Sequence, residues 1–218
     1  MMGAIELVND GQQYTLKLFQ EGKFTDSFVK EMNIALDEVE ADSSAKILVV
    51  TGNEKNFSQG FDIPFVLSCG DKAEDFINDS LRMVSRFLSF GTPTVAAING
   101  HAFGIGAVLA LACDFRCMRS DRGYFCLPEV NLNMGLKPLM NGIIKEKLSA
   151  GVARECVLSG KRYSGQEAFD KGIVDSAVEL DRLIGESINL LSDYSGKNPA
   201  TYADLKRTLY KGIIELTP

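Results

Sequence analysis

Two glycine-containing turns are places where main-chain groups could do chemistry. The first is NFSQGFDI at 56–63, and the second is NGHAFGIGAVLALACD at 99–114, where three glycines precede a smooth apolar run. Glycine this dense indicates a tight turn or a close approach to the backbone. Two such turns on separate strands could point two backbone N–H groups at one oxygen atom. That arrangement is an oxyanion hole, which stabilises negative charge on a reacting carbonyl oxygen.

The second turn, taken alone, is also compatible with a nucleotide site or with plain packing. The spacing Gly100-x₃-Gly104-x-Gly106 does not match the dinucleotide fingerprint G-x-G-x-x-G, and no phosphate-binding lysine follows it. Glycines that only let a helix and a strand pack closely would produce the same pattern.

Few side chains in these segments could move a proton. Glu129 follows Pro128 in LPEVNLNMGL at 127–136, and by itself it is typical of a surface residue after a proline turn. His101 is the one histidine of the chain, but no G-x-S-x-G elbow accompanies it, so a serine hydrolase is not favoured. The five cysteines include no C-x-x-C pair, and we expect no metal site.

Alternating strands and helices must position these groups. Asn9, Asp10 and Gly11 predict the turn of a hairpin, and "AKILVVTG" and "TPTVAAING" are typical of buried strands. We expect residues 53–65 to be irregular. The pattern predicts an α/β fold with largely parallel strands. Expected helices cover about 25–42, 71–90 with Asp71 as cap, ten residues after Gly104, 137–148, 149–159, a capping-box helix at 164–171, 180–194 and 200–215.

Composition limits the class of protein. The 218 residues are 45% hydrophobic and 24% charged, which fits one ordinary globular domain. The net charge of −6 without a basic stripe argues against nucleic-acid binding. No signal peptide and no apolar run long enough to cross a membrane is recognised, so we expect a cytoplasmic protein without a membrane partner.

The order of the motifs resembles the crotonase superfamily, the enoyl-CoA hydratases and isomerases. The resemblance rests on FSxGxD, then NGxAxGxGxxLALxCD, then PEVxLxMG, and it runs from about residue 5 to 195. It implies a spiral of ββα units over 1–195, followed here by a short helical segment at 196–218. Family members usually continue with more helix, which forms the trimerisation region. The trimer or dimer of trimers that the resemblance implies would here be formed with a shorter C-terminal region.

The resemblance also implies roles for individual residues. The backbone N–H groups of Phe61 and Ile105 would form the oxyanion hole for a thioester carbonyl of an acyl-CoA substrate, and Glu129 would be the acid/base. Coenzyme A is then part of the substrate, and no separate cofactor is expected. The implied coenzyme A contacts are Ser58, Gln59, Gly60 and the basic residues Lys23 and Lys55; the implied acyl pocket is Val108, Leu132 and Leu136.

The missing second carboxylate points to one reaction of the family. Hydratases carry a glutamate in the helix after the glycine loop, where this chain has Val108. One carboxylate, with a pKa raised by apolar neighbours, can move a proton from C2 to C4. The sequence therefore favours an isomerase that shifts a double bond from Δ3 to Δ2. Alternatives are another acyl-CoA reaction, such as hydration or thioester hydrolysis, or an acyl-CoA-binding protein without activity.

Overall fold

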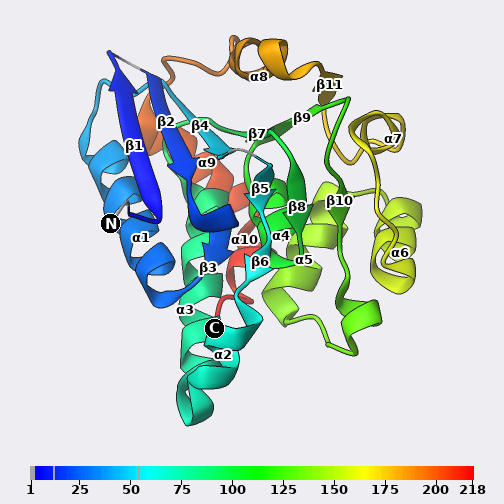
Figure 1. The fold of residues 1–218 in the computed structure, drawn as a ribbon. Coiled ribbons are helices and arrows are strands. Elements are labelled where there is room, and N and C mark those ends of the chain that lie inside the picture. Colours follow the sequence, from blue (N-terminus) through cyan, green and yellow to red (C-terminus); the bar gives the residue numbers. More distant parts are fainter. Residues whose placement is uncertain (1–2, 12, 54) are drawn as a thin grey trace.

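The main layer of the fold is a six-stranded sheet in the order β1-β2-β4-β7-β9-β11 (Figure 1). The computed structural model describes residues 3–11, 13–53 and 55–218. β1 and β2 form the expected antiparallel hairpin, and the other neighbours run parallel. The strands are β1 (Ile5–Asp10), β2 (Gln13–Leu18), β4 (Ile47–Gly52), β7 (Thr94–Ile98), β9 (Phe115–Arg119) and β11 (Ser176–Val178).

Two small parallel sheets lie at the carboxyl ends of the main strands. One has the order β10-β8-β5, with β10 at Phe125–Cys126, β8 at His101–Phe103 and β5 at Asn56–Ser58. The other pairs β3 (Lys23–Phe24) with β6 (Gly60–Phe61). The expectation of an irregular segment at 53–65 was therefore wrong. Strands this short show no periodicity, and their partners are distant in the sequence.

Ten α-helices and five 3-10 turns complete the described chain, and none of these helices is long and apolar enough to cross a membrane. The α-helices are α1 (Asp26–Ala41), α2 (Ile63–Ser68), α3 (Ala73–Arg86), α4 (Ile105–Ala112), α5 (Pro138–Lys147), α6 (Ala150–Ser159), α7 (Gly165–Asp170), α8 (Leu183–Leu190), α9 (Pro199–Leu209) and α10 (Lys211–Ile214). The 3-10 turns are η1 (Gln20–Gly22), η2 (Gly70–Lys72), η3 (Phe87–Ser89), η4 (Glu129–Leu132) and η5 (Leu180–Arg182).

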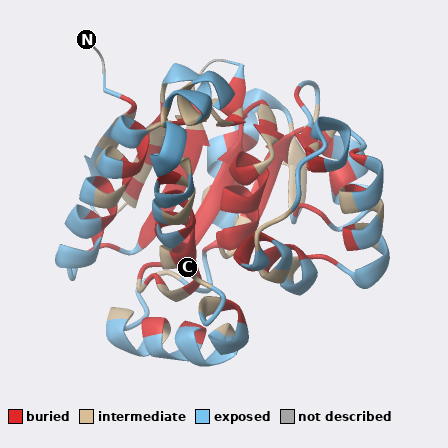
Figure 2. Cartoon of the chain, turned by 90° about the horizontal axis from the view of Figure 1, so that it is seen from below, coloured by how far each residue is buried: buried red, intermediate tan, exposed pale blue. Residues whose placement is uncertain are grey.

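Helices cover the main sheet on both faces, which explains its continuous apolar strands. Along β4, Leu48 and Val50 join the larger core, whereas Ile47 and Val49 join a second cluster with residues of α8. Successive strand residues point to opposite faces, so both sets must be apolar when both faces are covered. Figure 2 shows these strands as a buried layer among helices with exposed outer surfaces.

Local capping signals decide several helix starts. The Thr25 side chain caps α1, and Ser164 with Glu167 forms the expected capping box of α7. Asp71 is not a cap: it lies inside η2, and α3 begins after Lys72 without a side-chain cap. The expected helix at 200–215 is divided into α9 and α10.

The C-terminal segment packs back onto the core. The Lys206 ammonium group forms a buried ion pair of 2.7 Å with Asp114, just after α4. Asp114 also accepts from the backbone N–H of Thr94 at 2.9 Å. Ile213 belongs to the main core, and the Thr217 hydroxyl lies 2.7 Å from the Ser85 hydroxyl. Residues 196–218 therefore anchor the end of α4, the helix that the second glycine turn begins.

Replacing Lys206 with alanine should destabilise the fold by about 3–5 kcal/mol, because the Asp114 carboxylate would remain buried without its partner. Denaturant unfolding at neutral pH measures the change. The control is Lys211→Ala, whose exposed pair with Glu215 spans 3.9 Å and should matter by less than about 0.5 kcal/mol. Equal losses in the two variants would contradict the role given to the Lys206 pair.

Candidate active site

The three motifs meet in one open pocket. Its lining includes Ile63 of α2 and Ile77 of α3, and α2 with the start of α3 forms the lower end of the molecule in Figure 1. The volume of the pocket, counted together with its open mouth, is about 640 Å³. It is lined by Gln59, Gly60, Phe61, Ile63, Ile77, Gly104, Ile105, Pro128, Glu129, Leu132, Met134, Gly135, Lys137 and Met140. Residues from positions 59 to 140 thus come together although no local pattern links them.

The first glycine turn presents the amide of Phe61. The neighbouring amides are engaged elsewhere: Gly60 N–H donates to Ser58 Oγ at 3.1 Å, and Asp62 N–H donates to Phe24 O on β3 at 3.2 Å. Adjacent amides of an extended segment face opposite sides, so the Phe61 N–H faces away from β3. The Asp62 side chain accepts from Phe65 N at 3.1 Å and so caps α2.

Glycine at position 60 is required by the approach of the second turn. Its φ of +78° is a conformation that side-chain-bearing residues rarely adopt. A Cβ there would lie 2.7 Å from Phe103 O and 3.5 Å from Ile105 N. The main chain beside Phe61 therefore lies directly against the first residue of α4.

The second glycine turn presents the amide of Ile105. The first intrahelical bond of α4 runs from Val108 N to Gly104 O at 3.0 Å, so the Ile105 N–H lies at the helix start where amides lack an intrahelical acceptor. The helix dipole adds partial positive charge at this end. Together with the Phe61 amide, this end of α4 can hold a negatively charged oxygen.

Glu129 brings a carboxyl group to the same pocket. It is the first residue of η4 and only 9% exposed. A Cβ on Gly104 would lie 3.4 Å from its Oε1, and within the described chain its buried Oε2 has no hydrogen-bond partner. Burial among apolar groups raises the pKa of Glu129 above its usual value, in the direction that the sequence predicts.

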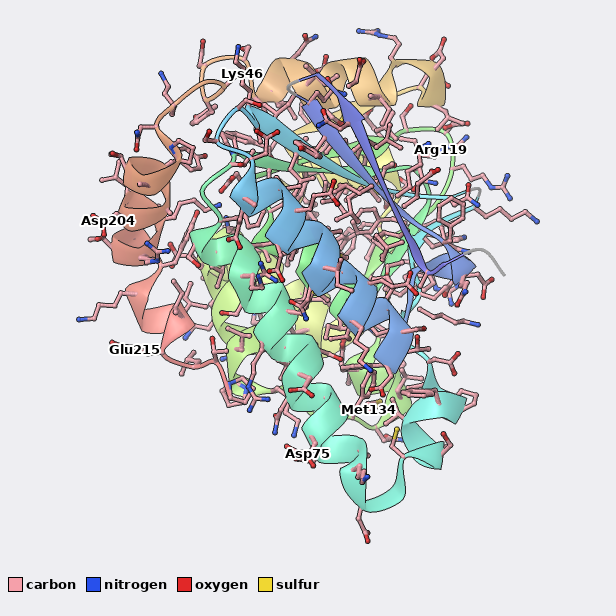
Figure 3. The ribbon with its side chains drawn as sticks, turned by 90° about the vertical axis from the view of Figure 1, so that its left-hand side faces the viewer. Lys46, Asp75, Arg119, Met134, Asp204 and Glu215 are labelled. Atoms are coloured by element: carbon pink, nitrogen blue, oxygen red, sulfur yellow. The ribbon has the colours of Figure 1, made fainter. Side chains whose placement is uncertain are left out.

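The apolar wall of the pocket differs from the expected one. Leu132 lines it, but Val108 is fully buried in the core and Leu136 packs against the core instead. Sequence reasoning missed Ile63, Ile77, Met134 and Met140, which come from α2, α3, the segment after η4 and α5. Figure 3 shows Met134 on the side of the molecule where α2 and α3 lie. The helical periodicity of α3 and α5 marks apolar faces but does not say which residues border a cavity.

The expected coenzyme A contacts are only partly accessible. Gln59 and Gly60 line the pocket, and Lys23 pairs in register with Gly60, with its ammonium 2.7 Å from Glu21. Lys55 is exposed and does not line the pocket. Ser58 is fully buried and its hydroxyl bonds to main-chain groups, so only its backbone is left for a contact with coenzyme A.

The histidine and the buried cysteines lie outside the pocket and pack against other parts of the fold. His101 contacts the rings of Phe103 and Tyr124, with centroids 5.1 and 5.6 Å away, and does not line the pocket. Burial and two nearby arginines lower its pKa. The described residues hold no group of three side chains able to bind a metal ion. Cys113, Cys117 and Cys126 are buried, as expected for core residues.

Comparisons with known proteins identify the family of this chain. A sequence model of the enoyl-CoA hydratase/isomerase family matches residues 20–215. Two relatives from Arabidopsis thaliana, enoyl-CoA delta isomerase 3 and the peroxisomal enoyl-CoA delta isomerase 2, are 31% and 30% identical; the alignments cover 93% and 92% of this chain and 89% of each relative. An enoyl-CoA hydratase/isomerase family protein from Pseudomonas syringae has the same fold, with a TM-score of 0.91 and 22% sequence identity. The superposition covers 98% of this chain and 93% of the Pseudomonas chain.

The chain therefore belongs to the enoyl-CoA hydratase/isomerase family of the crotonase superfamily. It is an acyl-CoA enzyme of that family with the crotonase fold.

Replacing Glu129 with glutamine should stabilise the fold at neutral pH relative to the wild type, and less so near pH 4. The folded-state pKa is raised, so ionising Glu129 in the pocket costs free energy. That cost is absent below the unfolded-state pKa of about 4.3 and is complete once the pH exceeds the folded-state pKa. Urea unfolding of both proteins across this range measures the difference.

Glu155→Gln is the matched control. A hydrogen bond from Lys171 lowers the pKa of Glu155, so its ionised form adds stability above the unfolded-state pKa, and that stability is lost as the pH falls. This variant should show the opposite sign. The quantity compared is the gain in stability of Glu129→Gln over the wild type at each pH. A smaller gain at neutral pH than at pH 4 would contradict the burial argument.

Proposed function

We propose that the protein is an enoyl-CoA isomerase that moves a double bond from Δ3 to Δ2 in an acyl-CoA thioester. The supporting observation is the composition of the pocket. Among the described residues that line it, Glu129 is the one carboxyl group, and it lies beside the start of α4. A single buried carboxyl group can carry a proton between two carbon atoms on one face of a substrate.

In the proposed reaction, Glu129 removes a proton from C2 of a 3-enoyl thioester. The electron pair moves into the conjugated system, and negative charge collects on the thioester oxygen. The N–H groups of Phe61 and Ile105 hold this oxygen as a dienolate. The protonated Glu129 then returns the proton to C4, which leaves the double bond between C2 and C3 and restores the carboxylate.

The raised pKa of Glu129 supports this assignment. An acid/base works best when its pKa lies near the working pH, because it must both accept and release the proton. Burial brings the carboxyl group toward that range. No cofactor has a role in this scheme, because the thioester itself delocalises the charge.

Glu129→Gln should lower isomerase activity by about 10²–10⁴-fold, the usual contribution of an acid/base group. The amide has nearly the same shape, so the affinity for a saturated acyl-CoA should remain close to that of the wild type. Conversion of a 3-enoyl-CoA to the conjugated 2-enoyl-CoA, followed by absorbance, measures the rate. Glu155→Gln, outside the pocket, serves as the activity control. Near wild-type turnover in Glu129→Gln would remove Glu129 from the mechanism.

Hydration is the second candidate, and Val108 is the position that separates it from isomerisation. The family resemblance places a second glutamate of hydratases here, and Val108 is fully buried. Val108→Glu should add modest hydration of a 2-enoyl-CoA, whereas Val108→Gln, of similar size, should not. The new carboxyl group enters an apolar core, so we expect a loss of about 1–3 kcal/mol of stability.

Hydration in these variants is followed as loss of the conjugated thioester absorbance, with folded protein verified by circular dichroism. A wild-type protein that hydrates a 2-enoyl-CoA as fast as it isomerises a 3-enoyl-CoA would favour the hydratase. Release of free thiol from saturated acyl-CoA would favour a hydrolase, and binding without any turnover would favour a silent member.

The remaining parts of the proposal concern binding, assembly and location. Gln59, Gly60 and Lys23 would contact the coenzyme A moiety, and Leu132 with the apolar wall from α2, α3 and α5 would contact the acyl chain. A homotrimer or hexamer is proposed from the family resemblance. A cytoplasmic location is proposed from the sequence. The buried free cysteines of the protein fit a reducing compartment.

A further inference from the structure

The Ser58 hydroxyl links η1 to the first glycine turn through buried hydrogen bonds. It donates to Gly22 O at 2.5 Å and accepts from Gly60 N–H at 3.1 Å. Ser58 is fully buried. A serine this enclosed, with both its donor and acceptor functions directed at main-chain groups, fixes the relative placement of the segments it joins.

The same hydroxyl also lies under the first turn of α4. A Cβ on Gly106 would collide with Ser58 Oγ, so glycine at this position lets the helix rest on the serine. On the other side, a Cβ on Gly22 would lie 2.8 Å from Ser58 Cα. Ser58, which belongs to the first turn, is therefore enclosed between the second turn and η1.

We propose that Ser58 is a positioning residue that holds the two N–H donors of the oxyanion hole at their working separation. By fixing the Gly60 amide, it determines which way the next amide, that of Phe61, points. By supporting Gly106, it limits how closely Ile105 approaches. This inference rests on the proposed function, because it assumes that a thioester oxygen binds between these amides.

Loss of the hydroxyl should act on charge stabilisation. In Ser58→Ala, Gly60 N–H and Gly22 O both lose a buried partner, and the Gly60–Phe61 peptide can tilt. A hydrogen bond weakens steeply once its angle departs from linearity, so the Phe61 amide would hold an enolate oxygen less well. Binding of a saturated acyl-CoA, which develops no negative charge on its thioester oxygen, should change little.

The test compares Ser58→Ala with Ser80→Ala and Ser187→Ala. Ser80 and Ser187 are also fully buried, and their hydroxyls donate to Phe76 O at 2.9 Å and Leu183 O at 2.8 Å. Both lie outside the pocket lining. Three quantities are measured: kcat with a 3-enoyl-CoA, the Kd of a saturated acyl-CoA, and the apparent pKa of bound acetoacetyl-CoA from its enolate absorbance.

For Ser58→Ala we expect kcat to fall about tenfold to a hundredfold, somewhat less than the 10²–10³-fold typical of deleting an oxyanion-hole donor. The apparent pKa of bound acetoacetyl-CoA should rise by about one to two units, the equivalent of the same factor. The Kd of saturated acyl-CoA should stay within about threefold, and both control serine variants should stay within about twofold of the wild type in every measurement.

A Ser58→Ala protein with kcat and enolate pKa within about twofold of the controls would overturn the proposal. Ser58→Cys guards against a folding defect, because its thiol is only slightly larger than the hydroxyl and leaves no empty space, but it is a weaker donor and acceptor. It should give intermediate values, and wild-type values would also overturn the proposal. If the wild type lowers the enolate pKa but does not isomerise, the proposed function fails while the enolate measurement still tests Ser58.

Discussion

The close approach of two main-chain turns fixes the geometry of the pocket. Gly60 lies so near Phe103 and Ile105 that no side chain fits between them, and Gly106 rests on Ser58. This contact brings the amide after Gly60 beside the first amide of α4. Backbone donors held in this way need no rearrangement when charge develops on an oxygen, which is why rigid main-chain sites stabilise enolates well.

The remainder of the fold holds α4 in place at both ends. At its start, Gly104 adjoins the Glu129 carboxyl group, and at its end the Asp114 carboxylate binds Lys206 and Thr94. Every residue of α4 is buried. Because the helix is enclosed by the sheet and by α3 and α5, its N-terminal amides have a fixed position relative to the pocket.

Ionising the Glu129 carboxyl group in the pocket costs free energy. A carboxyl group in apolar surroundings disfavours its ionised form, which destabilises the folded protein at neutral pH. The same desolvation brings the pKa of Glu129 toward the range in which a carboxyl group both accepts and releases a proton. The open mouth is bordered by exposed apolar side chains of Ile63, Leu132 and Met134, and by Lys137, whose ammonium lies 2.7 Å from Glu74. The Lys137–Glu74 ion pair links the start of α5 to α3 at this mouth.

Local sequence patterns and the order of the motifs were enough to predict the family, the hairpin, the buried strands, the capping box at Ser164 and the one candidate acid/base, Glu129. These features depend on neighbours within a few residues or on motifs whose order along the chain is distinctive. Asp71 was misread because a polar residue before an apolar helix favours a cap, yet a 3-10 turn there moved the helix start to Ala73.

The tertiary structure was needed to identify the side chains that border the pocket. Leu132 faces it while Val108 and Leu136 do not, and Ile77, Met134 and Met140 were not predicted. It also showed that Ser58 is buried between turns, and that residues 196–218 anchor α4. Burial and pocket access depend on how elements distant in the sequence pack against one another, and hydrophobic periodicity reports an apolar face without identifying what lies opposite it.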